Sequence, residues 1–243
     1  MDWLAALVAL TATFLLIPEL VKAGYRAYAL DLLGHGESIK PQDAKEYHVE
    51  ELYTHAAEWI DSLGCEQPIY LAGHSMGGFV SLNYALRNPG KIRRMVLVDP
   101  FYSPKQASPF LKLAGRNPEM SKRILDTTPR WLVKPMVRGN KNIAKNASPD
   151  TVRRMAQDYK RADPNILYIA PSTWDLTPQL SAVRQETLLI WGEKDQTLSP
   201  KSFPKMAERL PNCETHSYSN CGHTPHLTNA ASFNEKVLRF LED

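Results

Sequence analysis

The sequence has few cysteines and no pattern that would hold a metal ion or a nucleotide phosphate. Its 243 residues include only Cys65, Cys213 and Cys221. An odd number of scattered thiols excludes a disulfide framework and the paired spacing of a zinc site. A glycine-rich phosphate loop and internal repeats are also missing. We therefore expect a protein without metal or cofactor, and the unpaired cysteines favour a reducing, cytoplasmic location.

The sequence also lacks a hydrophobic run of membrane-spanning length. The apolar stretch at residues 3–17 has 15 residues, two of them threonines, whereas a spanning helix needs about 20. A secretory signal would begin with positive charge, and Asp2 is the only early charge. Both interpretations are disfavoured, although membrane association of this apolar N-terminus is not excluded by the sequence.

The composition fits one folded domain with positive charge concentrated in one segment. Hydrophobic residues make up 43% and charged residues 23%, which argues against disorder. The net charge is only +3, yet residues 112–161 contain 13 Lys or Arg against 4 Asp or Glu. Clustered positive charge attracts anions, so the segment suggests an anionic substrate or a membrane surface; solvated helix faces are the simpler explanation. Nucleic-acid binding is not predicted, because aromatic residues do not alternate with the basic ones and no nucleic-acid motif occurs.

A serine flanked by glycines follows a short apolar run. Residues 69–72 suggest a buried strand, Gly73-His74-Ser75-Met76-Gly77 follows, and helix-compatible sequence continues at once. A serine in a strained turn between strand and helix needs neighbours without bulky side chains. In return its hydroxyl is exposed beside a helix N-terminus, which favours developing negative charge. The pattern predicts a nucleophile elbow.

Two further polar residues follow predicted strands downstream. Asp195 lies in a turn after the apolar run at 187–191, and His223 precedes the last amphipathic helix. The chain order serine, aspartate, histidine is the order of one known hydrolase fold. Asp99 is a rival acid, because it also ends an apolar run, but Pro100 and the better-formed later turn favour Asp195.

Together these motifs resemble those of α/β-hydrolases of the Ser-His-Asp type, a superfamily that includes esterases and lipases. The resemblance covers residues 18–243 and rests on segments 29–38, 73–78, 191–195 and 222–223. It implies a nucleophile at Ser75, a general base at His223 and an orienting carboxylate at Asp195. The backbone N–H of Met76, directly after the nucleophile, is expected to bind the oxyanion.

Alternating strands and helices predict an α/β fold, a mostly parallel sheet flanked by helices. Strands are expected near 25–30, 69–72, 95–98, 187–191 and 214–218. Residues 101–175 are too long for a plain connection, and in the family such an insertion is a helical cap. The expected division is a hydrolase core at 1–100 and 176–243 with a cap at 101–175.

The beginning of the chain departs from the family pattern. Residues 1–16 contain neither glycine nor histidine, so the His-Gly loop that donates a second hydrogen bond to the oxyanion is missing. We expect an N-terminally abbreviated fold, consistent with a truncated or alternatively started hydrolase. Residues 4–10 are apolar enough to fill the missing strand's place between 25–30 and 69–72. A helix is equally compatible, because alanine and leucine favour it.

The predicted activity is hydrolysis of a carboxylic ester or related carbonyl substrate through an acyl-enzyme on Ser75. One alternative is a carbon–carbon bond hydrolase or acyltransferase, since the same triad serves all three. Another is a catalytically impaired homologue that binds a ligand or partner. The expected partner is a small ester or acyl molecule; the sequence does not indicate an oligomeric state. Predicted substrate contacts are His74, Phe101, Trp131, Trp174 and His226.

Overall fold

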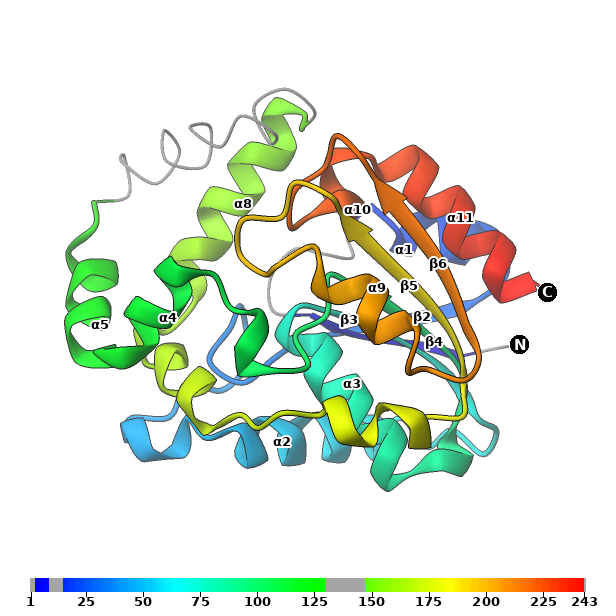
Figure 1. The fold of residues 1–243 in the computed structure, drawn as a ribbon, viewed down its shortest axis with the longest axis horizontal. Coiled ribbons are helices and arrows are strands. Elements are labelled where there is room, and N and C mark those ends of the chain that lie inside the picture. Colours follow the sequence, from blue (N-terminus) through cyan, green and yellow to red (C-terminus); the bar gives the residue numbers. More distant parts are fainter. Residues whose placement is uncertain (1–2, 9–14, 130–146, 243) are drawn as a thin grey trace.

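A computed structural model describes residues 3–8, 15–129 and 147–242 (Figure 1). Within these residues, six strands form one parallel sheet in the order β2-β1-β3-β4-β5-β6. The strands are β1 (Trp3–Val8), β2 (Arg26–Asp31), β3 (Ile69–His74), β4 (Ile92–Val98), β5 (Glu186–Gly192) and β6 (Cys213–Tyr218). The predicted mostly parallel α/β sheet is confirmed.

Helices between and after the strands cover both faces of the sheet, as parallel strands require. They are α1 (Ile17–Lys22), α2 (Val49–Ser62), α3 (Met76–Arg87), α9 (Ser202–Ala207), α10 (Pro225–Thr228) and α11 (Ala230–Glu242). The helix α2 shows why its ends fall where they do. The ring of His48 accepts the Glu50 N–H at the start, and Gly64 takes a left-handed φ of 65° just after the end.

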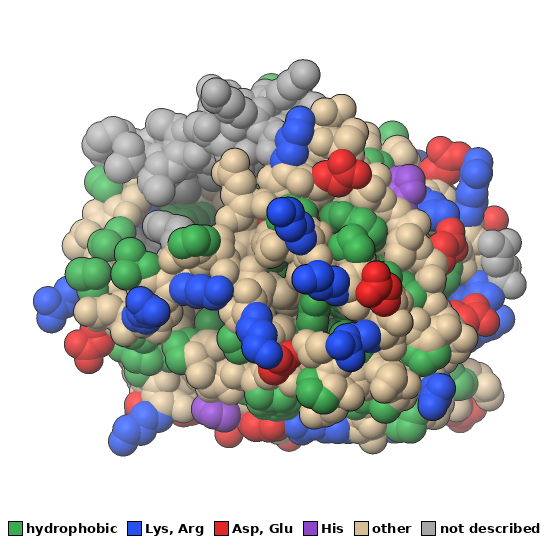
Figure 2. Space-filling view, in the orientation of Figure 1, with side chains coloured by type: hydrophobic (Ala, Val, Ile, Leu, Met, Phe, Trp, Pro, Cys, Tyr) green, Lys and Arg blue, Asp and Glu red, His purple; other side chains and the backbone are tan. Residues whose placement is uncertain are grey.

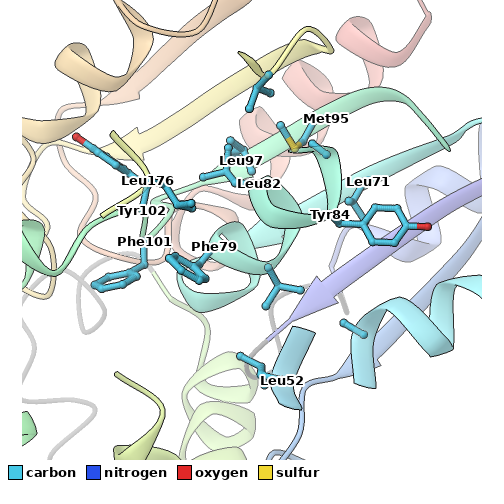
Figure 3. Close-up of a cluster of buried hydrophobic side chains, with 14 of the residues drawn as sticks. Leu52, Leu71, Phe79, Leu82, Tyr84, Met95, Leu97, Phe101, Tyr102 and Leu176 are labelled. Carbon is cyan, nitrogen blue, oxygen red and sulfur yellow. The ribbon is translucent and has the colours of Figure 1, made fainter. Parts of the chain in front are cut away.

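Two hydrophobic cores lie on opposite faces of the sheet, because successive strand residues point to opposite sides. On β4, Met95 and Leu97 face α2, α3 and α9, and part of this core is drawn in Figure 3. Val96 and Val98 face α1 and α11 instead. Both faces of the strand are buried, which explains the continuous apolar run in the sequence.

The place of the missing family strand is filled by β1. Leu4 pairs with Ala27 of β2 on one side and with Tyr70 of β3 on the other, and its side chain is 1% exposed. The strand alternative for this segment is therefore confirmed over residues 3–8, and the helix alternative is wrong there. No helix in the described parts of the chain is long and apolar enough to cross a membrane.

In its described residues, the long insertion between β4 and β5 is largely helical. It contains α4 (Pro109–Arg116), α5 (Pro118–Thr127), α8 (Pro149–Arg161) and the 3-10 turns η3 (Pro104–Gln106), η4 (Pro164–Tyr168), η5 (Ala170–Ser172) and η6 (Thr177–Ala182). Figure 1 shows α4, α5 and α8 beyond the end of the sheet toward which the arrowheads of β5 and β6 point. The carboxyl ends of parallel strands carry the functional loops of such folds. The position suits the predicted cap, whose boundaries stay a prediction.

Carboxylates neutralise part of the positive charge of this insertion. On α8, Arg153 and Arg154 both pair with Asp150, and Arg161 pairs with Asp158 and with Glu37. On the face shown in Figure 2 the Lys and Arg side chains are scattered singly over the surface. These features support solvated helix faces as the explanation for the positive charge of α8.

Candidate active site

The serine predicted as nucleophile stands in a strained turn between β3 and α3. Ser75 has φ 52° and ψ −117°, a left-handed conformation that a residue with a side chain rarely adopts. Its N–H donates to the Val98 carbonyl at 3.0 Å, and its own carbonyl accepts the Phe101 N–H at 2.9 Å. These bonds to the end of β4 and the loop after it hold the turn in place.

Position 73 requires glycine, because other atoms of the elbow lie where a side chain would be. A Cβ there would lie 2.4 Å from the Ser81 hydroxyl and 2.5 Å from the Gly77 carbonyl oxygen. Both distances are shorter than any real Cβ contact. The spacing of glycines that marks the elbow in the sequence thus has a steric cause in the structure.

We expect Gly73→Ala to lower the turnover number at least tenfold and to destabilise the fold by about 1–3 kcal/mol, because the added methyl group forces the elbow apart. Gly90→Ala is the matched control, since a Cβ there would meet nothing within 4 Å. Turnover and urea unfolding of both variants check the prediction. Equal behaviour of the two variants would contradict it.

Ser75, His223 and Asp195 form one hydrogen-bonded chain. The Nε2 atom of His223 lies 2.9 Å from the Ser75 Oγ, and its Nδ1 lies 2.7 Å from the Asp195 Oδ2. With a proton on Nδ1 shared with the carboxylate, Nε2 is free to accept the serine proton. The three residues come from the loops after β3, β5 and β6, as the chain order predicts. The structure therefore assembles the geometry that nucleophilic catalysis needs.

The carboxylate of Asp195 is held ionised by its surroundings. Its second oxygen, Oδ1, accepts the N–H groups of Thr197 at 2.7 Å and Leu198 at 3.1 Å. Burial acts to raise the pKa of Asp195, but the hydrogen bond and charge of His223 and these two N–H groups outweigh it and lower the pKa. Sequence reasoning missed the two N–H donors; the spacing of an Asx turn, aspartate to threonine two residues on, was the available signal.

The ring of His74 lies next to that of His223, and the ring of His226 packs edge-to-face on His74. The Nε2–H of His74 donates to the His223 carbonyl at 2.8 Å, and the ring of His226 lies 4.6 Å from that of His74. Burial lowers the pKa of His74 to about 3 and that of His226 well below its ordinary value, so both rings are neutral near pH 7. His226 is only 3% exposed. The structure thus gives His74 a bond to the backbone of His223 and places His226 in the interior, not at the substrate contact predicted for it.

The other predicted contacts lie near the start of α3. Phe101 and Trp174 both pack on Phe79, with ring centroids 5.9 Å and 5.3 Å from it. Phe79 follows Ser75 by one helical turn, and Figure 3 shows Phe101 beside it. Phe101 is itself 5% exposed and belongs to the hydrophobic core on this face of the sheet. Trp131 lies outside the described residues.

Of the expected oxyanion site, the structure describes only the side formed by Met76. Met76 is the first residue of α3, where a backbone N–H has no intrahelical partner and points toward incoming negative charge. Residues 9–14 follow β1 where the family has its His-Gly loop, and they lie outside the described residues. The predicted lack of the second donor therefore remains a prediction.

Asp99, the rival acid, does not bond His223. Its Oδ1 accepts the Gly192 N–H at 3.0 Å, while the His223 Nδ1 pairs with Asp195. Geometry therefore favours Asp195 as the carboxylate that orients the base.

Comparison with known proteins places the fold in a family. Residues 10–230 match the family described as alpha/beta hydrolase fold. The 2-hydroxymuconate semialdehyde hydrolase of Pseudomonas sp. (strain CF600) is 30% identical over 243 residues, 94% of this chain and 80% of that protein. Lipase 1 of Psychrobacter immobilis is 26% identical over 219 residues, 83% of this chain and 64% of that protein.

Solved structures agree on the fold. A bromoperoxidase from Bacillus anthracis superposes with a TM-score of 0.82 at 22% identity, covering 100% of this chain and 92% of that one. An esterase from Thermogutta terrifontis gives 0.80 at 22% identity, covering 100% and 89%. With a family match over most of its length and the sheet order described above, the chain belongs to the α/β-hydrolase fold family.

Proposed function

We propose that this protein is a serine hydrolase that cleaves a small carbonyl substrate through an acyl-enzyme on Ser75. The observation that carries the proposal is the hydrogen-bonded chain from the Ser75 hydroxyl through His223 to Asp195, at 2.9 Å and 2.7 Å. A serine hydroxyl is a weak nucleophile near neutral pH, and this arrangement supplies the base that activates it.

The steps follow from the geometry. The Ser75 Oγ attacks the carbonyl carbon while its proton passes to the His223 Nε2, and the carbonyl oxygen becomes an oxyanion near the Met76 N–H. Collapse of this intermediate breaks the bond to the leaving group, which takes the proton from His223. Water then attacks the acyl-enzyme with His223 again as base, releasing a carboxylic acid and restoring Ser75.

The bond that is cleaved has two candidates. Ester hydrolysis is the simplest use of the triad, and a lipase is among the relatives. Carbon–carbon bond hydrolysis is favoured by the relative named for 2-hydroxymuconate semialdehyde, at 30% identity, and by another named for 2-hydroxy-6-oxo-6-phenylhexa-2,4-dienoate, at 25%. These names describe carbonyl acids without an ester group, so hydrolysis in those proteins must break a carbon–carbon bond. Both candidates share the attack by Ser75.

A fluorophosphonate probe tests the shared step independently of the substrate. We expect the wild-type protein to be labelled on Ser75, Ser75→Ala to be unlabelled, and Ser62→Ala, an exposed serine at the end of α2, to be labelled like wild type. Assays with short p-nitrophenyl esters and with a 2-hydroxy-6-oxo-dienoate then separate the two candidates. A folded wild-type protein that neither reacts with the probe nor turns over any of these substrates would instead be the impaired, ligand-binding homologue.

We expect a grafted oxyanion loop to raise activity. Replacing residues 9–14 by a family-type loop with a His-Gly pair should increase kcat on a short-chain p-nitrophenyl ester by about 10²-fold or more, with KM less affected. The reason is that the Met76 N–H alone gives one hydrogen bond to an oxyanion that normally receives two. A same-length graft without the His-Gly pair is the control. Equal turnover of wild type and graft would show that another N–H already completes the site.

A further inference from the structure

A second buried carboxyl lies against the acid of the candidate triad. Asp99 follows β4 with a φ of 40°; apart from Ser75, it is the only non-glycine residue with positive φ in the described parts of the chain. Asp99 is fully buried, with 0% of its surface exposed. One carboxyl oxygen of Asp99, one of Asp195 and a ring nitrogen of His223 all lie within 4.8 Å of one another. Strained backbone of this kind gathers at functional sites.

The two carboxyl groups are unequally supplied with hydrogen-bond donors. Asp195 accepts from His223, Thr197 and Leu198. Asp99 accepts only the Gly192 N–H on Oδ1, and no N–H or O–H of the described residues donates to its Oδ2. Two buried carboxyl groups this close oppose each other's ionisation. The negative charge therefore belongs on Asp195 and the proton on Asp99.

We propose that Asp99 is a positioning residue that keeps a proton on Oδ2 and donates it in a hydrogen bond to the Asp195 carboxylate. The acid of the triad is then a carboxylic acid–carboxylate pair with one negative charge. Asp99 limits the rotation of Asp195 and, through it, of His223. This role in catalysis rests on the proposed function, whereas the protonation state does not.

The electrostatic surroundings agree with this assignment. Burial raises the pKa of Asp99 well above its ordinary value, and the charge of Asp195 and a hydrogen bond to it act in the same direction, against the lowering effect of the Gly192 N–H. The titratable groups that face Asp99 from other elements are Asp195 after β5, His223 after β6 and the Cys221 thiol. None of them carries a permanent positive charge that would hold Asp99 ionised.

Thermal unfolding tests the protonation state without any substrate. A carboxyl whose pKa is raised in the fold binds more protons folded than unfolded, so its contribution to stability is present below about pH 4 and is lost as the pH rises toward the folded pKa. The Asp99→Asn variant has no carboxyl group to titrate at this position, so it does not lose this stability as the pH rises. We expect the Tm of Asp99→Asn minus that of wild type to increase by about 3 °C or more per pH unit between pH 5 and the folded pKa.

The matched control for unfolding is Glu66→Gln, the same exchange of a carboxyl for an amide at an exposed position. Its Tm difference from wild type is expected to stay constant over this range. A constant or decreasing difference for Asp99→Asn would mean that Asp99 is ionised in the fold, and would overturn the proposal. This result does not depend on whether the protein hydrolyses anything, so failure of the proposed function is seen separately.

Kinetics test the positioning role. The amide of Asp99→Asn still donates to Asp195, so we expect kcat to fall by about threefold at most, whereas Asp99→Leu, of similar size without a donor, should lose about tenfold or more with KM little changed. Loss of the donor should also move the acidic limb of the pH profile of kcat/KM in the leucine variant and not in the asparagine variant. If kcat falls equally in the two folded variants, Asp99 does not act as a hydrogen-bond donor, and the proposal is contradicted.

Discussion

Ser75→Ala and His223→Ala are each expected to lower kcat/KM by about 10⁶-fold, close to abolishing hydrolysis, because each removes a partner in the proton transfer that creates the nucleophile. Asp195→Asn should lower it by about 10⁴-fold, since the amide favours the wrong tautomer of His223. Initial rates on the best substrate of the panel give these values. Circular dichroism and Tm confirm that the variants are folded.

The comparison with Asp99 decides which carboxylate orients the base. Asp99→Asn keeps the hydrogen bond between the Asp195 Oδ2 and the His223 Nδ1, which measures 2.7 Å, and should lose about threefold in activity at most. If Asp99→Asn proves as damaging as Asp195→Asn in folded protein, the choice of Asp195 is wrong. If alanine at 75 leaves hydrolysis unchanged, the reaction does not pass through Ser75 at all.

Deleting residues 1–12 is expected to give insoluble or molten protein. The deletion removes β1 from between β2 and β3 and leaves backbone groups at the centre of the sheet unpaired. Each unpaired buried group costs about 1–3 kcal/mol, and a few of them equal the whole stability of an ordinary domain, about 5–15 kcal/mol. Near-UV circular dichroism and urea unfolding measure the loss of fixed packing.

A point substitution tests the same strand more gently. Leu4→Ala should destabilise the protein by about 2–5 kcal/mol, because the side chain is 1% exposed within the core beside α1 and α11. Val21→Ala, at a position 57% exposed on α1, is the control and should change stability by less than about 0.5 kcal/mol. A sharp, unshifted unfolding transition after deletion or after Leu4→Ala would show that β1 is dispensable.

The sequence by itself determined the parts of this protein that depend on neighbours in the chain. Continuous apolar runs such as 69–72 and 95–98 predict strands buried on both faces, because each such strand needs apolar residues on both sides. The glycines around Ser75 predict the elbow, since a strained turn rejects side chains at those positions. The order of Ser75, Asp195 and His223, each after a strand, was enough to predict that they meet, because parallel strands end at one edge of the sheet.

Only the tertiary structure decided what depends on residues distant in the chain. Residues 3–8 are compatible with helix or strand by themselves, and pairing with β2 and β3 makes them a strand. Asp99 and Asp195 are both turn carboxylates in the sequence, and only the adjacency of β4 and β5 brings them together, so that the charge of Asp195 opposes the ionisation of Asp99. The same holds for His226, which is polar in the sequence but buried behind His74 in the fold. Local pattern fixes backbone geometry, whereas burial and charge coupling arise from contacts that no local pattern contains.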